Sequence, residues 1–384
     1  MFMRNFSASC VLVLFVASFF YSCEKEEKSI PLELDDLKAL EVDYATTFQL
    51  YEHEDYLVIE LLQPWPEADE SRYLIFIKED ASTKNIPTNY TQIQLPIERL
   101  VVTSTTHIPS LISLDLLDKW VGFPGLDYVS SKEARERINN KQVKEIGKNE
   151  GLNTEVILSI QPQLIIGFAV EGSNKSLNNL EKAGIPTLYN SDWLEKHPLG
   201  KAEWIKVFGL LGGKQQEAFE EFEKIATTYE EAKKIASKAK NKTKVISGAM
   251  HQDVWYLPHG DSWQGVLLKD ANTEYIYASS SGSGSIASSF EKVLELGKDA
   301  EFWISPAQFK SYKDLESSNR HYTNFYAFQQ KNIFGIAHQT GETGGVLYYE
   351  LAPNRPDLVL KDLVKILHPE VDLAHELFFF KALE

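Results

Sequence analysis

One long amphipathic segment, residues 214–239, constrains the fold most, because it lies between two stretches that alternate strand and helix patterns. Its apolar residues are spaced so that they follow one face of a helix, and Glu and Lys cover the other side. At about 1.5 Å per residue, such a helix is roughly 40 Å long, which is enough to connect two lobes. We therefore expect two α/β lobes joined by a long helix.

The segments on both sides of this helix support that expectation. Short apolar runs alternate there with helical patterns, an order typical of parallel sheets covered by helices. We expect the first α/β lobe over 99–200, linking helices over 201–240 and the second α/β lobe over 241–384. Residues 41–98 instead carry alternating strand-like runs such as YLVIEL at 56–61, interrupted by prolines, and they predict a small β-rich N-terminal module.

The N-terminus carries the pattern of an export signal. Residues 1–22 contain one arginine and an apolar core at 11–20, which is too short to span a membrane and suits a signal peptide. Cys10 would leave with that signal, so we expect Cys23 to carry a lipid anchor, with a tether over 23–40. The mature protein should be exported and anchored to a membrane, facing the periplasm or the cell surface.

Composition limits the class of partner. Lys and Arg number 39 and Asp and Glu 55, so the formal net charge is −16. This balance argues against nucleic acid, whose phosphates are neutralised by Lys and Arg. After the N-terminus no apolar stretch is long enough to span a bilayer, so contact with the membrane is expected through the lipid anchor only.

Five segments, in the right order, resemble one protein family: RLVVTSTT at 99–106, NTEVILSIQPQLII at 153–166, LEKAGIP at 180–186, SFEKVLEL at 289–296 and KDLVKILHPE at 361–370. The family is that of the class III periplasmic binding proteins, the substrate-binding proteins of ABC transporters for iron-siderophore, haem and cobalamin. The resemblance covers about 99–370 and leaves 41–98 outside. The acidic EKEE after Cys23 resembles the export signal of surface lipoproteins in Bacteroidetes.

The resemblance implies two Rossmann-like lobes that close only slightly and that bind a ligand without chemistry. The ligand would be a metal macrocycle or a ferric chelate, so iron or cobalt would belong to the ligand and no resident cofactor is expected. The expected partners are that small molecule and an ABC permease or a TonB-dependent receptor, with the protein itself a monomer. Glu171, Glu195 and Glu291 are candidates for docking onto the transporter.

The ligand is expected in the cleft at the carboxyl ends of the strands, where open α/β sheets bind ligands. Aromatic faces there would desolvate a ring, and hydroxyls and imidazoles would hold its edges. The candidates are Thr105, Thr106, Tyr128, Phe168 and Trp193 in the first lobe, and His251, Trp255, His259, Trp263, Trp303, Arg320 and Tyr349 in the second. Core packing competes with this role for each tryptophan, above all for Trp263 and Trp303. The shortage of arginine favours cobalamin or haem over an anionic siderophore.

Three alternatives stay open at this point. GDSW at 260–263 and DLAH at 372–375 resemble blocks of GDSL-type esterases, with Ser262 as the nucleophile and His375 as its base. Scattered histidines, namely His107, His251, His259, His321 and His338, could bind a free metal ion in a protein of the same fold. The β-rich module could also bind a partner in an adhesion or scaffold lipoprotein. We favour the binding protein, without catalytic residues and without a metal site of its own.

Overall fold

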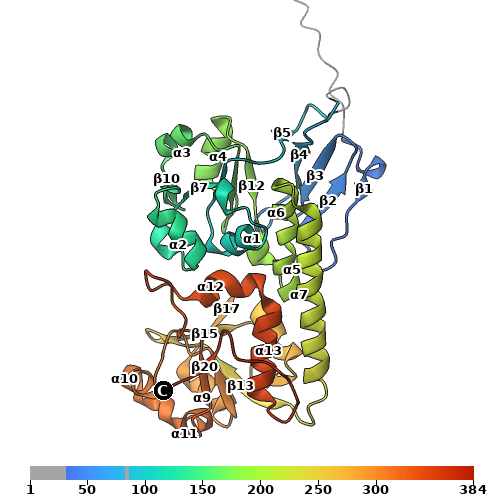
Figure 1. Ribbon diagram of the computed structural model, residues 1–384. Helices are drawn as coiled ribbons and strands as arrows, with labels where there is room; N and C mark the ends of the chain where they lie inside the picture. Colours follow the sequence, from blue (N-terminus) through green and yellow to red (C-terminus); the bar gives the residue numbers. More distant parts are fainter. Residues whose placement is uncertain (1–31, 83–85) are drawn as a thin grey trace, which may run out of the picture.

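The computed structural model describes residues 32–82 and 86–384, so the predicted signal peptide and Cys23 lie outside the described residues. It shows two α/β lobes, one above the other in Figure 1, with a small sheet beside the first and a long helix along both. The expected class, two lobes joined by a long helix with a β-rich N-terminal module, is confirmed. Among the described residues, no helix combines the length and the apolar character needed to cross a membrane.

The N-terminal module is a five-stranded sheet in the order β1-β2-β3-β4-β5. Its strands are β1 (Lys38–Ala39), β2 (Phe48–Glu52), β3 (Tyr56–Leu61), β4 (Arg72–Ile77) and β5 (Thr91–Gln94). Every residue of β3 is buried. One face of β3 packs into the main core through Leu57 and Ile59, and the other packs against a smaller apolar cluster through Tyr56 and Val58. The module is therefore a layer covered on both sides.

The first lobe contains a parallel sheet in the order β12-β11-β6-β7-β8. Its strands are β6 (Leu100–Val102), β7 (Trp120–Phe123), β8 (Lys144–Glu145), β11 (Leu164–Gly167) and β12 (Thr187–Tyr189), and its helices are α1 (Ile108–Ser113), α2 (Lys132–Asn139), α3 (Thr154–Ile160) and α4 (Lys175–Lys182). A short hairpin of β9 (Gly147–Lys148) and β10 (Gly151–Leu152) follows β8. Asn153 and Asn174 cap α3 and α4 by accepting backbone N–H bonds.

The second lobe contains a similar sheet in the order β16-β13-β18-β19-β20, parallel except for β20. Its strands are β13 (Thr243–Ser247), β16 (Thr273–Tyr275), β18 (Phe302–Ile304), β19 (Ile333–Gly335) and β20 (Lys381–Ala382), and its helices are α8 (Trp263–Asp270), α9 (Phe290–Gly297), α10 (Tyr312–Ser318), α11 (Tyr326–Gln329), α12 (Leu347–Leu351) and α13 (Pro356–Leu367). The sequence reading missed a second, antiparallel sheet in this lobe. It consists of β14 (Ala249–His251), β15 (Val254–Pro258) and β17 (Ser285–Ser288).

The long helix is α7 (Gln215–Ala236), and it lies within the predicted range of 214–239. It follows α5 (Pro198–Glu203) and α6 (Ile205–Leu211), packs on both, and also packs on α13 of the second lobe. In Figure 1 it runs beside both lobes. Gly213, with φ of +68°, provides the turn that starts it.

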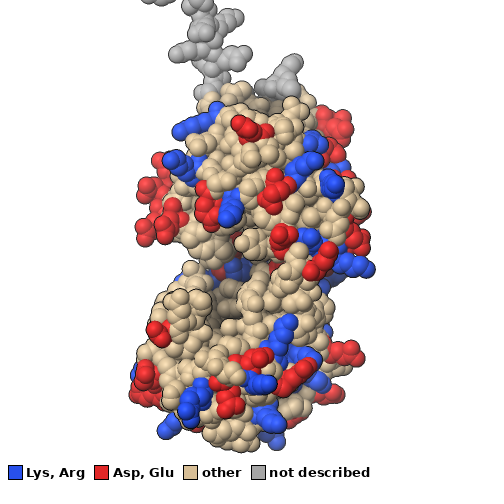
Figure 2. Space-filling view, turned by 90° about the vertical axis from the view of Figure 1, so that its left-hand side faces the viewer, with Lys and Arg blue, Asp and Glu red and all other residues tan. Residues whose placement is uncertain are grey.

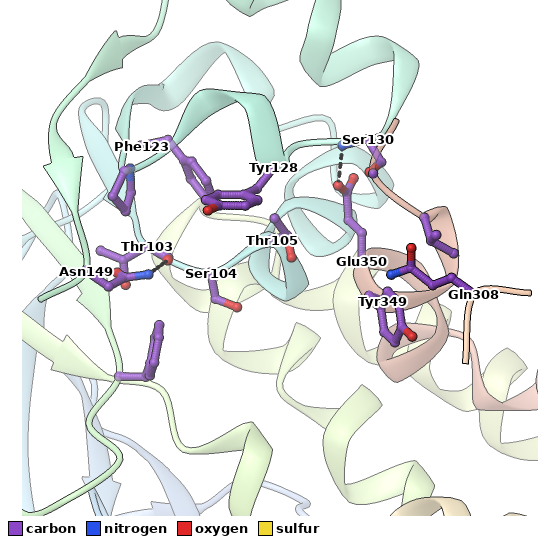
Figure 3. Close-up of a pocket in the computed structure, with 14 residues that line it drawn as sticks. Thr103, Ser104, Thr105, Phe123, Tyr128, Ser130, Asn149, Gln308, Tyr349 and Glu350 are labelled. Carbon is purple, nitrogen blue, oxygen red and sulfur yellow. Dashed lines mark hydrogen bonds between the residues drawn. The ribbon is translucent and has the colours of Figure 1, made fainter. Parts of the chain in front are cut away.

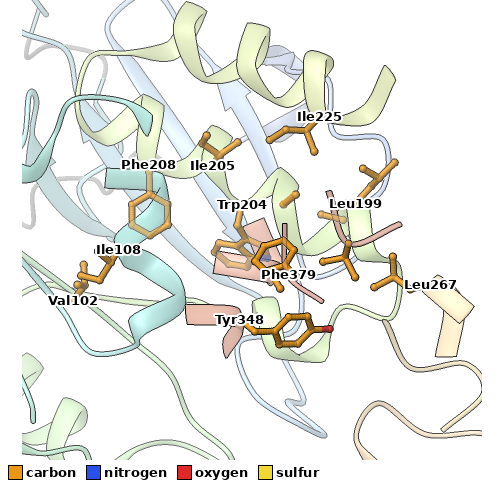
Figure 4. Packing of buried hydrophobic residues seen from close by; sticks show 14 of the residues in the cluster. Val102, Ile108, Leu199, Trp204, Ile205, Phe208, Ile225, Leu267, Tyr348 and Phe379 are labelled. Carbon is orange, nitrogen blue, oxygen red and sulfur yellow. The ribbon is translucent and has the colours of Figure 1, made fainter. Parts of the chain in front are cut away.

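One apolar core runs through the whole described molecule. Val102 and Ile108 of the first lobe, Trp204 of the linking helices, and Tyr348 and Phe379 of the second lobe belong to the same cluster. Figure 4 shows these side chains converging from the different elements. Because protein cores are close-packed and resist deformation, this continuity limits how far the lobes can move against each other.

Two buried carboxylates attach the N-terminal module to the linking helices. Glu203 at the end of α5 accepts hydrogen bonds from the amides of Asp43 at 2.9 Å, Tyr44 at 2.8 Å and Ala45 at 2.7 Å. Lys206 donates to the same carboxylate at 2.7 Å, and both side chains are buried. Several hydrogen bonds therefore surround the ion pair, which is what makes a buried charge tolerable.

Glu195 likewise attaches the next two residues of the module through its carboxylate. Its carboxylate accepts from the amides of Thr46 and Thr47 at 2.9 Å each, and from both of their hydroxyls. Glu195 is only 1% exposed. The sequence analysis gave Glu195 as a candidate for contact with a transporter, and its burial contradicts that role. Glu195 is instead part of the junction between the module and the lobes.

His107 is buried in the shared core at the start of α1, against the ring of Phe208. Neither of its ring nitrogens has a hydrogen-bond partner in the described part of the chain. Burial lowers the pKa of His107 to about 4, although the nearby carboxylate of Asp192 opposes the shift. The imidazole is therefore neutral at physiological pH, and a role as an accessible metal ligand does not fit this position.

Replacing Glu203 should loosen the module. In Glu203→Ala three amides and the ammonium group of Lys206 would lose their acceptor inside the protein, and we expect the free energy of unfolding to fall by about 3 kcal/mol or more. Urea denaturation followed by circular dichroism measures this change. Glu231→Ala, at an exposed position of α7, is the matched control and should change stability by about 0.5 kcal/mol or less. Equal stability of the two variants would contradict the prediction.

The pKa of His107 predicts an acid-sensitive core. The unfolded chain takes up a proton near the ordinary pKa of 6.5, whereas the native state does so only near 4. Stability should therefore fall as the pH drops from 6.5 to 4, by roughly 3 kcal/mol from this group. His107→Leu should remove that part of the pH dependence in denaturation curves across this window. The exposed-site variant His321→Leu should keep the wild-type slope, and a wild-type slope in His107→Leu would refute the assignment.

Candidate functional site

A cavity of about 370 Å³ lies between the lobes. On the first-lobe side its walls follow the carboxyl ends of β6, β7 and β11, and on the second-lobe side they come from the loop after β18 and from the start of α12. Figure 3 shows these side chains around the cavity. The lining consists of Thr103, Ser104, Thr105, Phe123, Pro124, Tyr128, Ser130, Asn149, Phe168, Gln308, Gly345, Val346, Tyr349 and Glu350.

The chemical character of this cavity is aromatic and hydroxylic rather than charged. Among the described residues that line it, none is Lys, Arg or His, and Glu350 is the sole acid. The Glu350 carboxylate is already engaged, because the amides of Ser130 and Ser131 donate to it at 2.7 and 3.1 Å. Burial raises the pKa of Glu350. Figure 2 shows the hollow between the lobes with uncharged surface over much of its rim, and with charged side chains at its right-hand edge and on the outer faces.

A second cavity of about 290 Å³ adjoins the second lobe. Its lining includes the backbone after β13 and the side chains of Met250, His251 and Tyr256 from the antiparallel sheet. Tyr349 lines this cavity as well as the first. Since its side chain is 49% exposed, Tyr349 stands between the two cavities with an accessible ring.

The structure brings four of the predicted ligand-binding residues together. Thr105, Tyr128, Phe168 and Tyr349 all line the first cavity. Tyr128 is 75% exposed, and its ring is held beside Gly125, where a Cβ would lie only 2.7 Å from it. His251 lines the second cavity. These five residues remain candidates for ligand contact.

Two of the predicted residues are core residues instead. Trp255 and Trp303 have no exposed surface, and their rings stack with centroids 5.3 Å apart. Their Nε1 groups donate to the carbonyls of Ser247 and Gly248 at 2.9 and 2.7 Å. Side chains alternate across a strand, so β15 directs Trp255 inward and Tyr256, 45% exposed, outward.

Five other predicted residues lie outside both cavities: Thr106, Trp193, His259, Trp263 and Arg320. The hydroxyl of Thr106 is paired with that of Ser104 at 2.9 Å. Trp263 starts α8 and stacks on Tyr348 within the core. Arg320 is exposed in a short 3-10 helix of the second lobe.

The sequence reading missed residues that tertiary structure brings to the cavity. Asn149 reaches it from the β9–β10 hairpin, where its side chain donates to the carbonyl of Thr103 at 3.1 Å. Gln308 reaches it from the loop after β18, in which Ser305 and Ala307 have positive φ angles. Polar residues directly after predicted strands were the available signal, and Thr103 and Ser104, which follow β6, carry it most clearly.

The esterase alternative does not match the structure. The buried hydroxyl of Ser262 donates to the carbonyl of His259 at 2.7 Å and accepts from the amide of Gly265 at 3.2 Å, so it caps α8. The imidazole of His375 is hydrogen-bonded to the buried carboxylate of Asp362. Residues 372–375 lie in no helix or strand, so the surface helix expected there is absent.

A free-metal site finds no support either. Among the described residues, no group of three or more His, Cys, Asp or Glu side chains is placed to hold a metal ion. Glu171 and Glu291, by contrast, are exposed, one on each lobe, before α4 and in the first turn of α9. Both remain predictions as contacts with a transporter.

Comparison with known proteins places the fold. Residues 100–340 match the model of a family described as periplasmic binding protein. An uncharacterized lipoprotein of Methanocaldococcus jannaschii is 25% identical over 82% of this chain and 76% of its own length.

Two solved structures share the fold. A periplasmic haem binding protein from Pseudomonas aeruginosa has a TM-score of 0.55 and 18% identity, covering 73% of this chain and 96% of its own. The periplasmic vitamin B12 binding protein of Vibrio cholerae has a TM-score of 0.52 and 13% identity, covering 71% and 97%. The N-terminal module precedes the region that the family model matches.

Proposed function

The chain belongs to the periplasmic binding protein family, and from this premise we propose that it captures a metal macrocycle or a ferric chelate between its lobes. The family consists of binding proteins that deliver small molecules to ABC permeases, not of enzymes. The aromatic and hydroxylic cavity between the lobes is the observation that carries the proposal. It lies at the carboxyl ends of the strands, where α/β sheets bind ligands.

The charge of the residues that line the two cavities limits the class of ligand that we propose. Carboxylate-rich ligands are usually held by Arg or Lys, and neither residue type is among those that line the two cavities. Aromatic faces from Phe168, Tyr128 and Tyr349 suit a ring system, and the neighbouring hydroxyls and amides suit its polar edge. These features favour a weakly charged, amide-bearing macrocycle such as cobalamin over haem and over an anionic ferric siderophore. His251 lines the adjoining second cavity, and we propose it as the histidine that contacts the metal of such a ligand.

The N-terminal part of the chain supports membrane attachment. Cys23 follows a signal-like segment, and the similar protein of Methanocaldococcus jannaschii is described as a lipoprotein. We propose a lipid anchor at Cys23 and an ABC permease as the partner, with Glu171 and Glu291 as one contact from each lobe. The protein would act as a monomer.

Ligand titration tests the binding site. Tryptophan fluorescence of the purified protein is followed with cyanocobalamin, haemin and a ferric catecholate, with free tryptophan as the inner-filter control, and we expect saturation with cyanocobalamin. Removing an aromatic contact costs about 1.5–3 kcal/mol, so Phe168→Ala and Tyr349→Ala should each weaken binding about 10-fold or more. Tyr326→Ala, exposed on α11, should bind normally. No saturable response to any of the three would reject the proposed ligand class.

Fractionation tests the anchor. Expressed with its signal, the wild-type protein should sediment with membranes and incorporate radiolabelled palmitate. Cys23→Ala should lose the label and move to the soluble fraction, because a buried acyl chain provides most of the membrane affinity. Cys10→Ala, within the predicted signal, should behave like wild type. A labelled, membrane-bound Cys23→Ala protein would contradict the assignment.

A further inference from the structure

A short hairpin of the second lobe reaches across to the first lobe beside the cavity. We call residues 340–346 the clasp. Thr340 and Val346 form an isolated bridge at its base, and the amide of Gly341 donates to the carbonyl of Gly345 at 2.8 Å. Gly344 has φ of +88°, which permits the tight reversal. The clasp leads directly into α12.

Polar contacts hold the tip of the clasp on the first lobe. The hydroxyl of Thr343 donates to the carbonyl of Asp127 at 2.6 Å. Glu342 accepts from the side-chain amide of Asn139 at 3.0 Å and lies 3.7 Å from the Nε of Arg135. These contacts are exposed or only partly buried, and exposed ion pairs of this kind contribute about 0–1 kcal/mol each. The tip is therefore held weakly.

The glycines on the two sides of the clasp contact Ser130 closely. A Cβ on Gly341 would come within 2.6 Å of the Cα of Ser130, and one on Gly345 within 2.6 Å of its hydroxyl. Next to the clasp, the buried carboxylate of Glu350 binds the amides of Ser130 and Ser131, as the dashed line in Figure 3 marks for Ser130. Glu350 thus fixes α12 to the first lobe, and Val346 anchors the base of the clasp in the core. The rest of the clasp rests on the first lobe through its tip contacts and its glycine surface.

The clasp forms part of the cavity wall. Gly345 and Val346 line the cavity beside the loop that carries Tyr128 and Ser130. The cavity of about 370 Å³ is near the lower end of ligand pockets, which span roughly 300–1,000 Å³, and a metal macrocycle is larger than a drug-sized ligand. The shared core and α7 restrict movement of whole lobes, so a local element is the simplest means of widening the cavity for such a ligand.

We propose that the clasp is a gate, which opens to admit a ligand to the cavity and closes beside it, so that it sets the rates of binding and release. This inference rests on the proposed function, because a gate needs a ligand. The glycines and the weak tip contacts make it an interlobe contact that breaks at little cost. The buried bonds of Glu350 keep α12 in place while the clasp moves.

A disulfide tests the gate. A Cβ on Gly345 would lie 3.9 Å from the Cβ of Ser130, close to the mean of about 3.8 Å for disulfides, and Gly345 does not have a positive φ. The double variant Ser130→Cys, Gly345→Cys is made in the full chain with Cys10→Ser and Cys23→Ser, and purified in mild detergent. The two single variants serve as controls. Association and dissociation of cyanocobalamin and haemin are measured by stopped flow in the oxidised and reduced states.

The oxidised double variant should bind and release the probe about 10-fold more slowly than the reduced form, with a smaller change in Kd. Preloaded probe should be retained after oxidation. Equal rates in the two redox states would overturn the gate while leaving the proposed function intact. Absence of binding by the reduced protein would instead count against the proposed ligand class. The gate is then tested by a measurement that needs no ligand.

Thiol labelling is that ligand-free measurement. In Ser130→Cys the thiol lies beneath the clasp, so its reaction with DTNB reports opening. Adding Glu342→Ala and Thr343→Val should speed the labelling several-fold, because all three tip contacts are lost. A thiol at Ala218→Cys, buried in α7, reports global unfolding and should label at an unchanged rate. Unchanged labelling at position 130 would overturn the gate.

Discussion

The two lobes keep a fixed separation because one apolar core passes from the first lobe through the linking helices into the second. Trp204 and Phe208 sit in the middle of this core, and α7 packs along it on the outside. The space between the lobes is therefore a permanent feature of the fold and not a product of loose domains. Within that space a few side chains from each lobe shape the cavity, as Phe168 and Tyr349 do here.

The N-terminal module strengthens the same junction. Glu195 and Glu203 bind five consecutive amides of residues 43–47, so the module is fastened where the first lobe meets α7. Buried carboxylates of this kind add little net stability compared with apolar packing. Their hydrogen bonds, however, form only when the partner groups adopt one specific arrangement. Their position suggests why a sheet outside the common family region remains integral to this protein.

The architecture could be predicted well from the sequence, because the periodic spacing of apolar residues indicates which side chains are buried. The spacing of apolar residues over 214–239 sufficed for α7, and the βα alternation sufficed for both lobes. The candidate site was harder to predict. Trp255 and Tyr256 are neighbours on one strand, and only the pairing of β15 with β14 and β17 decides which of them faces the cleft. Asn149 and Gln308 are brought to the cavity by loop geometry, which short-range patterns do not encode.

The continuous core also bears on how the chain reaches its native state. Trp204 and Phe379 belong to one cluster although they are far apart in the sequence, and folding that depends on such distant contacts is slow. The first lobe cannot complete its packing until the second is available, so the nascent chain would stay incompletely folded for longer than a chain built from independent domains. If the chain crosses a membrane before it folds, as the proposed signal peptide and lipid anchor require, that delay is an advantage.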